Sequence, residues 1–268
     1  MKPIHSAFIT AIAGAMLAAA PAASAATLKE AAAGSHRSDA NKARDAYRHP
    51  VETLSFFGVK PDMKVVEVSP SAGWYTEILA PYLMEKGTLY AAGSDPEGSD
   101  YSKKSAAGFK AFLDAKPEVY GKVQTTVFGP GKMDAMGPAG GADMILTFRN
   151  VHNWYMGGIA QDAFNAFFSA LKSGGTLGVV EHRLPESAPD EAMKKTGYMK
   201  VSAVKAMAEK AGFKLVAESN INNNPKDTKD YPKGVWTLPP NYAEKDVDRA
   251  KYTAIGESDR FTMKFVKP

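Results

Sequence analysis

The stretch from Lys64 to Leu83, KVVEVSPSAGWYTEILAPYL, decides the fold class. Its first part, Lys64 to Ser69, is a short β-branched run that predicts a strand. Trp74 to Leu83 has amphipathic spacing and predicts a helix, with Pro81 bending or ending its last turn. Between them, the small residues Ser69 to Gly73 allow a tight turn and a close approach of the backbone to a ligand. A plain strand-to-helix turn would use the same residue types.

The alternation of strands and helices continues along the chain. Further strands are predicted at residues 88–92, 123–128, 142–148, 176–181, 214–219 and 261–266, and helices at 51–57, 101–113, 161–171 and 200–211. This alternation indicates βαβ units and a mostly parallel sheet. The strands are apolar throughout, which indicates helices on both faces. Residues 222–259 are too polar and Pro-rich for a crossover helix, so they predict a long loop or lid.

The N-terminus has the features of a secretory signal peptide. Lys2 gives a basic start, and an apolar stretch runs from Ala7 to Ala20. Ala23-Ser24-Ala25 supplies a cleavage site of small residues, so we expect cleavage after Ala25. A membrane anchor is the alternative, but the stretch is short for a membrane span. We therefore expect a periplasmic or secreted protein with no stable membrane anchor, whose residues 26–268 form one domain.

Residues 26–57 predict a helical arm in front of the first strand. Thr27 to Arg48 is Ala-rich and mixed in charge, and we expect Arg37, Lys42, Arg44 and Arg48 on its surface. The formal net charge of the 268-residue chain is +4, and opposite charges are interspersed. That charge predicts no nucleic-acid partner. Cys is absent, and GxSxG, Walker and GxGxxG motifs are missing, which disfavours Ser and Cys hydrolases, P-loop enzymes and dinucleotide dehydrogenases.

Polar and aromatic residues follow the fourth and fifth strands, where ligands bind in open α/β sheets. After the fourth strand comes RNVHNWY, residues 149–155, in which Asn150 or His152 could bind a substrate and His152 could accept its proton. Trp154, Tyr155 and His182 are candidate substrate contacts. The alternative is a His bonded to the backbone with the two aromatic residues packed at the core edge.

Glu181, His182 and His152 also form a conceivable metal site, because His and carboxylate suit several divalent metals. No short HxH or HxxxH spacing is present, and we predict no metal.

The chain resembles the class I S-adenosylmethionine-dependent methyltransferase superfamily, and within it a set of predicted secreted methyltransferase-like proteins. Glu67 to Gly73 occupies the place of the family motif: an acidic residue, three residues, Gly, one residue, Gly. The matching stretches cover most of residues 36–268: HPVETLSFFGVKPDMKVVEVSPSAGWYTEILAPYL, ADMILTFRNVHNWY, SGGTLGVVEHR, AGFKLVAESNINNNP and SDRFTMKFVKP. The resemblance implies a Rossmann-like sheet of seven strands whose last strand is antiparallel and pairs with the sixth.

The resemblance also implies S-adenosylmethionine as cofactor, with contacts at Glu67, Ser69, Ser71, Gly73, Asp95 and Arg149. Two positions depart from the family pattern. Ser71 stands at the first loop Gly, where a positive φ would cost roughly 1 kcal/mol. Gly93 stands where the family has an acidic residue for the ribose hydroxyls, so Asp95 either takes that role or caps its turn.

Two functions follow from these observations. The first is methyl transfer from S-adenosylmethionine to an unidentified small-molecule acceptor, with catalytic residues His152 and Asn150. The second is an exported, non-catalytic protein that binds a ligand or partner on the same fold. Space for an adenosyl group next to Gly73 would favour the first, and a blocked cleft the second.

Overall fold

The computed structural model describes residues 26–268. The predicted signal peptide, residues 1–25, lies outside the described residues. Within residues 26–268, every helix is too short or too polar to cross a membrane.

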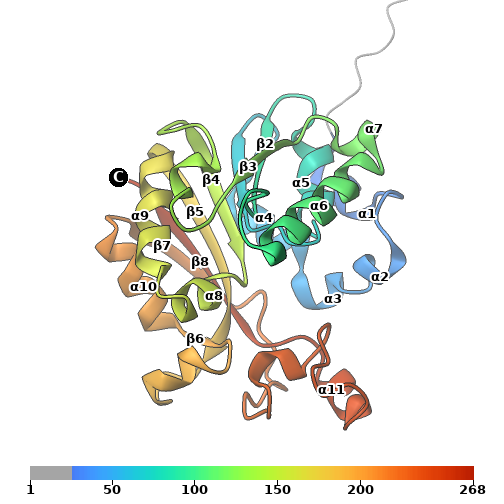
Figure 1. Ribbon diagram of the computed structural model, residues 1–268, viewed down its shortest axis with the longest axis vertical. Coiled ribbons are helices and arrows are strands. Elements are labelled where there is room, and N and C mark those ends of the chain that lie inside the picture. The colour runs from blue at the N-terminus through green and yellow to red at the C-terminus, as the bar shows by residue number, and fades with distance from the viewer. Residues whose placement is uncertain (1–25) are drawn as a thin grey trace, which may run out of the picture.

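One sheet runs through the centre of the molecule (Figure 1). Its principal strands are β1 (Lys64–Val68), β2 (Thr88–Gly93), β3 (Gln124–Val127), β4 (Ala142–Phe148), β5 (Leu171–Leu184), β7 (Lys214–Ser219) and β8 (Arg260–Val266), in the order β3-β2-β1-β4-β5-β8-β7. The first five are parallel, and β8 lies antiparallel between β5 and β7. The predicted fold class and antiparallel last strand are confirmed. The sheet has one strand more than predicted, the two-residue β6 (Met199–Lys200), which pairs with β5.

Helices cover both faces of the sheet (Figure 1). On one face lie α4 (Pro50–Phe57), α5 (Thr76–Leu83), α6 (Asp100–Asp114) and α7 (Pro117–Tyr120); on the other lie α8 (Val151–Met156), α9 (Ala160–Ala170) and α10 (Val201–Lys210). Successive residues of a strand point to opposite faces of the sheet: Val65 packs with α4 and α5, whereas Val66 and Val68 pack with α9. This double burial explains why the strands are apolar throughout. Short 3-10 turns lie at Met133–Met136 and Asp190–Lys194.

The N-terminal arm consists of α1 (Leu28–Ala33), α2 (Asp39–Lys42) and α3 (Asp45–Arg48), and it is anchored on α5. Glu77 of α5 accepts hydrogen bonds from Arg37 Nε at 3.3 Å and from Asn41 Nδ2 at 3.0 Å. The expected surface position of Arg37 and Arg48 is wrong, because both side chains are buried. Their guanidinium groups lie over the ring of Trp74, at 5.0 and 4.6 Å from its centroid. Carboxylates and this ring make burial of the two cations tolerable.

The segment between β7 and β8 is folded rather than extended. It contains a 3-10 turn at Gly234–Thr237 and the helix α11 (Arg249–Ile255), which we did not predict. Tyr231, Leu238 and Tyr252 form a small apolar cluster of their own. Asp227 ties the segment to the domain, since it accepts hydrogen bonds from Tyr198 Oη at 3.1 Å and from Asp259 N at 2.8 Å.

Candidate functional site

A cleft with two lobes opens at the carboxyl ends of β1, β2 and β4. The two cavities have volumes of about 1060 and 320 Å³, and both are lined by Ser69, Pro70, Ser71, Asn150 and Asn153. These five residues therefore form the ridge between the lobes. We call the larger cavity the α6 lobe and the smaller one the histidine lobe. The position is the one at which open α/β sheets bind ligands.

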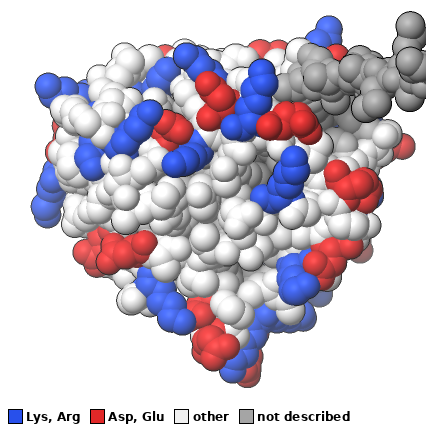
Figure 2. All heavy atoms as spheres, turned by 90° about the horizontal axis from the view of Figure 1, so that it is seen from above, with Lys and Arg blue, Asp and Glu red and all other residues white. Residues whose placement is uncertain are grey.

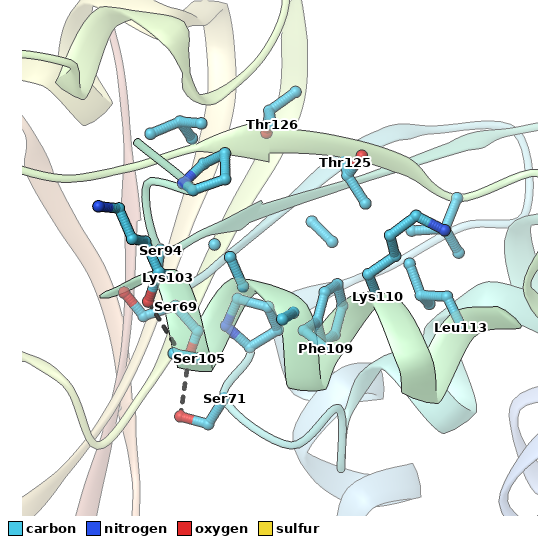
Figure 3. A pocket seen from close by; sticks show the side chains of 18 of the residues that line it. Ser69, Ser71, Ser94, Lys103, Ser105, Phe109, Lys110, Leu113, Thr125 and Thr126 are labelled. Atoms are coloured by element: carbon cyan, nitrogen blue, oxygen red, sulfur yellow. Dashed lines mark hydrogen bonds between the residues drawn. The ribbon is translucent and has the colours of Figure 1, made fainter. Parts of the chain in front are cut away.

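The α6 lobe lies between α6 and the strands β2 and β3. Figure 3 shows Phe109 and Leu113 of α6 along one wall and Thr125 of β3 on the opposite side. Near the ridge, Ser94 Oγ donates to Ser105 Oγ at 3.1 Å. Gly93 ends β2 at this cavity, and a Cβ placed on it would meet no atom within 4 Å. The lobe therefore has open space at the carboxyl end of β2.

Backbone strain is concentrated at the ends of β1 and β4. Ser69 and Ser71 have φ near 54°, and Arg149 has φ of 61°. Such values are unusual for residues with a Cβ and tend to cluster at ligand sites. Ser71 thus adopts the conformation that costs a non-glycine residue about 1 kcal/mol or more. Gly73, at φ of 80°, is held differently, because a Cβ there would lie 2.4 Å from Phe112 of α6.

Glu67 is a buried carboxyl at the end of β1 that lines the histidine lobe. Thr76 of α5 donates a hydrogen bond to its Oε2 at 2.6 Å. Burial raises the pKa of Glu67 to about 7, although the Thr76 hydrogen bond acts in the opposite direction. Glu67 therefore changes charge near neutral pH and would be held ionised by a cationic ligand.

Asp95 is occupied within its own turn and lines neither cavity. Its Oδ1 accepts a hydrogen bond from Glu97 N at 2.9 Å, and its Oδ2 lies 2.8 Å from Lys132 Nζ. Both contacts lower the pKa of Asp95. The contact with Glu97 N caps the turn that begins at Asp95.

The histidine lobe is built around a buried His–Glu pair. His152 Nδ1 lies 3.0 Å from Glu181 Oε1, and the same carboxylate accepts from the backbone N–H groups of His152 at 3.2 Å and His182 at 2.7 Å. A carboxylate partner fixes the tautomer in which Nδ1 carries the proton. Nε2 of His152 is then the unprotonated nitrogen, and His152 lines the cavity.

Asn150 links the ends of β1 and β4. Its side-chain Nδ2 donates to Val68 O at 3.1 Å and to Thr147 Oγ1 at 3.2 Å. The side chain is buried, and it lies in the ridge between the two lobes. Because the side-chain amide donates to both strand ends, Asn150 is a residue that positions the ridge.

His182 belongs to the same lobe, with its ring 5.2 Å from that of His152. Its Nδ1 is 2.5 Å from Ser258 Oγ. Burial holds the pKa of His182 well below its usual range, and His152, Arg260, Arg149 and Arg48 lower it further. The imidazole is therefore neutral at physiological pH.

His152, Glu181 and His182 offer three possible metal ligand atoms within 4.8 Å of one another. The structure thus brings together the three residues of the conceivable metal site. Two observations oppose a dication there. The Glu181 carboxylate already accepts hydrogen bonds from His152 and His182, and the guanidinium groups that lower the pKa of His182 would repel positive charge.

Trp154 and Tyr155 lie on the apolar side of α8 rather than in the histidine lobe. Trp154 packs edge-on against Phe128 and Phe167, with ring centroids 5.2 and 5.5 Å away, and borders only the α6 lobe. Tyr155 is partly buried against the same apolar cluster. The aromatic ring that does border the histidine lobe is Trp236, 5.9 Å from His152, from the segment between β7 and β8.

Four arginines meet at one carboxylate beside the histidine pair, a cluster that the sequence did not predict. Glu257 lies 2.7 Å from Arg44, 2.9 Å from Arg48, 3.7 Å from Arg149 and 2.5 Å from Arg260. The Arg cluster holds the pKa of Glu257 far below its usual range despite burial, and burial lowers the pKa of Arg149 to about 10. No spacing in the sequence connects Arg44 with a residue more than two hundred positions away.

No family model matches this chain, and no curated protein matches it in sequence. Solved structures do match in fold. An S-adenosylmethionine-dependent methyltransferase from Aquifex aeolicus is 15% identical, with 84% of this chain and 93% of that one covered and a TM-score of 0.55.

Two further structures give the same result. The [4+2]-cyclase SpnF is 14% identical over 83% of this chain and 81% of its own, with a TM-score of 0.56. Phosphoethanolamine N-methyltransferase 2 from Haemonchus contortus, in complex with S-adenosyl-L-methionine, is 15% identical, with a TM-score of 0.52, over 83% of this chain and 53% of that one. The chain therefore has the Rossmann-like fold found in S-adenosylmethionine-dependent methyltransferases.

Proposed function

We propose that this protein is an S-adenosylmethionine-dependent methyltransferase that acts on a small acceptor in the histidine lobe. The observation that carries the proposal is the two-lobed cleft at the end of β1, with the His152–Glu181 pair in its smaller lobe. Open space at Gly93 and at the ridge Ser69–Ser71 supports room for an adenosyl group beside the first loop, although Gly73 itself lines neither lobe. Fold similarity to methyltransferases supports the same reading.

The residues fit the cofactor in two parts. Gly93, Ser94 and the ridge residue Ser71 would hold the adenosyl group at the α6 lobe. Glu67 would face the ammonium group of the methionyl part. Burial disfavours its ionised form and raises its pKa, so a nearby cation would stabilise the carboxylate. When bound, the cofactor supplies an activated methyl group on a sulfonium, which becomes a neutral thioether once the methyl group has left.

The chain's own task is alignment, exclusion of water and proton removal. His152 Nε2 is the acceptor nitrogen in the cavity, and Glu181 stabilises the imidazolium that forms when His152 takes the acceptor's proton. The neutral His182 and the ring of Trp236 flank His152. Asn150 and the strained residues hold the ridge in place.

The test is thermal unfolding of residues 26–268 with and without S-adenosylmethionine and S-adenosylhomocysteine. A ligand at a hundred times its Kd stabilises by about 2.7 kcal/mol, which raises the Tm by roughly 5–10 °C. Gly93→Leu should abolish the rise, because its side chain would enter the α6 lobe without backbone clash. Gly108→Leu is the matched control, since Gly108 also has no atom within 4 Å of an added Cβ but does not line the lobe. Gly73 is a poor choice because a side chain there would strain its turn and strike Phe112.

An absence of any rise at millimolar ligand would exclude cofactor binding. A rise that persists in Gly93→Leu would place the nucleoside elsewhere. A second candidate function, a non-catalytic binding protein on this fold, is favoured by Gly93 and by the engagement of Asp95 within its turn. That candidate predicts no rise with either nucleoside.

We also propose that the protein is exported and acts in the periplasm or outside the cell. Lys2, the apolar stretch and Ala23-Ser24-Ala25 support this proposal. Expression of the full chain in a bacterial host should yield a protein whose N-terminal sequence starts at Ala26. An uncleaved protein in the cytosol would contradict export.

A further inference from the structure

The Arg cluster around Glu257 carries more positive charge than its surroundings neutralise. Four guanidinium groups contact one carboxylate, which leaves three positive charges without a partner in the cluster. Glu67, the other carboxyl that lines the lobe, has a pKa raised by burial to about 7 and so carries only part of a negative charge at neutral pH. Glu181 is engaged by His152 and two backbone N–H groups. Arg48 and Arg260 are buried, and excess charge on buried side chains is costly unless a counter-ion balances it.

Three of these arginines border the histidine lobe and have guanidinium N–H groups that make no hydrogen bond with the described residues. Among residues 26–268, Arg149 makes no side-chain hydrogen bond, and Arg44 and Arg48 donate only through Nε to Glu257. Arg48 is 2% exposed as a whole and lines the cavity, and its hydrogen bonds to Glu257 leave its terminal nitrogens unused. Arg260 differs, because it donates to Ser258, Tyr47 and Glu257 and is fully engaged. Arg44, Arg48 and Arg149 thus form a preformed anion cradle.

The cofactor alone cannot balance this charge. S-adenosylmethionine carries one carboxylate against an ammonium and a sulfonium, so it adds net positive charge to the cleft. Resting on the methyltransferase function proposed above, we propose that the acceptor is an anion whose carboxylate or phosphate group is bound by Arg44, Arg48 and Arg149. That group anchors the acceptor beside His152, whose Nε2 removes the proton from the atom to be methylated.

The test uses malonate and inorganic phosphate as probe anions, against chloride at equal ionic strength, with and without S-adenosylhomocysteine. Both probes should raise the Tm of residues 26–268 by about 5 °C at tenfold excess over Kd. Arg149→Gln should weaken probe binding by roughly tenfold or more, since it removes charge-assisted hydrogen bonds. Arg44→Gln, whose side chain is 25% exposed, is a second variant that should fold.

Arg249→Gln is the control, because Arg249 lies over Tyr242 in α11 and does not line the lobe. Its probe binding should equal that of the unaltered protein. Two results would overturn the anion cradle. One is a Tm with the probes no higher than with chloride, and the other is a Tm rise in Arg149→Gln and Arg44→Gln equal to that of the unaltered protein.

The measurements with S-adenosylhomocysteine distinguish two anionic groups that the cradle could bind: that of the acceptor and the carboxylate of the methionyl part. Probe and S-adenosylhomocysteine that bind together support an anionic acceptor. Mutually exclusive binding assigns the cradle to the methionyl carboxylate and overturns the acceptor proposal. If the nucleoside binds and the probes do not, this inference alone fails. If the probes bind and the nucleoside does not, the cradle is supported and methyl transfer is excluded.

Discussion

Glu67 shows at the scale of one residue how burial sets the chemistry of the cleft. It is 2% exposed, and one hydrogen bond from Thr76 only partly compensates for the lost solvation. Burial therefore penalises the ionised form and raises the pKa from 4.5 to about 7. The same carboxyl is then available to a cationic ligand, which would restore its charge.

Replacement of Glu67 with Gln should remove a pH dependence of stability. The folded state of the unaltered protein holds the Glu67 proton more tightly than the unfolded state does. Its stabilising contribution is present below pH 4.5 and is lost as the pH rises through about 7. Relative to the unaltered protein, Glu67→Gln should therefore gain about 3 kcal/mol across that window. Urea unfolding at several pH values measures this difference, and a constant difference would show that the pKa of Glu67 is ordinary.

Gly93 offers a gain-of-function test. An acidic side chain here would enter open space at the α6 lobe, at the position that the resemblance to methyltransferases assigns to the ribose hydroxyls. Gly93→Asp should tighten S-adenosylhomocysteine binding by roughly tenfold, because hydrogen bonds to a charged group contribute about 1.5–3 kcal/mol. Calorimetric titration measures the Kd. Gly129→Asp is the control, since Gly129 also has open space but lies outside the lobe, and equal affinity in both variants would contradict the assigned ribose position.

At the scale of elements, the N-terminal arm is part of the site rather than an appendage. α1 to α3 are anchored through Glu77 of α5, and this anchoring carries Arg44 and Arg48 to the histidine lobe. Trp74, at the start of α5, supports Arg37 and Arg48 with its ring and donates to Asn41 O at 3.1 Å. The anion cradle therefore depends on the docking of short helices that would be unstable alone.

Glu77→Ala should loosen the arm. The change removes acceptors for Arg37 and Asn41, and among residues 26–268 it leaves the buried Arg37 with Asp45 as its one carboxylate partner. We expect a loss of about 2 kcal/mol or more in the free energy of unfolding. Hydrogen exchange of residues 28–48 should rise together with that loss. Glu52→Ala, an exposed acid on α4, is the control; an equal effect there would mean that Glu77 has no special role.

At the scale of the whole molecule, five distant parts of the chain build one cleft: the arm, the turn after β1, the start of α8, the end of β5, and the segment between β7 and β8. Inside the cleft, positive charges from these parts lie close together. On the outer surface, positive and negative side chains are mixed. Figure 2 shows Lys and Arg interspersed with Asp and Glu around the edge of one face, whose centre is largely uncharged.

This summed charge leads to a prediction about metals. His152, Glu181 and His182 resemble a metal site in residue type, but the neighbouring guanidinium groups raise the potential there. Equimolar Zn²⁺ or Mn²⁺ should leave the Tm unchanged, and chelation should not lower it. A rise in Tm with Zn²⁺ that is lost in His182→Asn would show instead that the three residues hold a metal.

The sequence by itself determined the order of the main strands and helices, because these depend on local periodicity and on turn residues such as Gly58 and Gly212. It also located the residues that follow β1, β4 and β5, since parallel strands bring their carboxyl ends to one edge. Positive φ at Ser71 follows from its place in the turn. It did not predict α8, where a polar sequence forms a short helix supported by packing of Trp154.

Only the tertiary structure decided which side chains meet in the cleft. Arg44 and Arg48 look like surface charges in a polar helix, yet Glu257, more than two hundred residues away, draws them inward. Trp154 and Trp236 are the same residue type, and packing places the first at the edge of the core and the second beside His152. Such contacts depend on the docking of whole elements. Hydrophobic periodicity indicates which face of an element is buried, but it does not indicate which charged side chains come together when elements from distant parts of the chain dock.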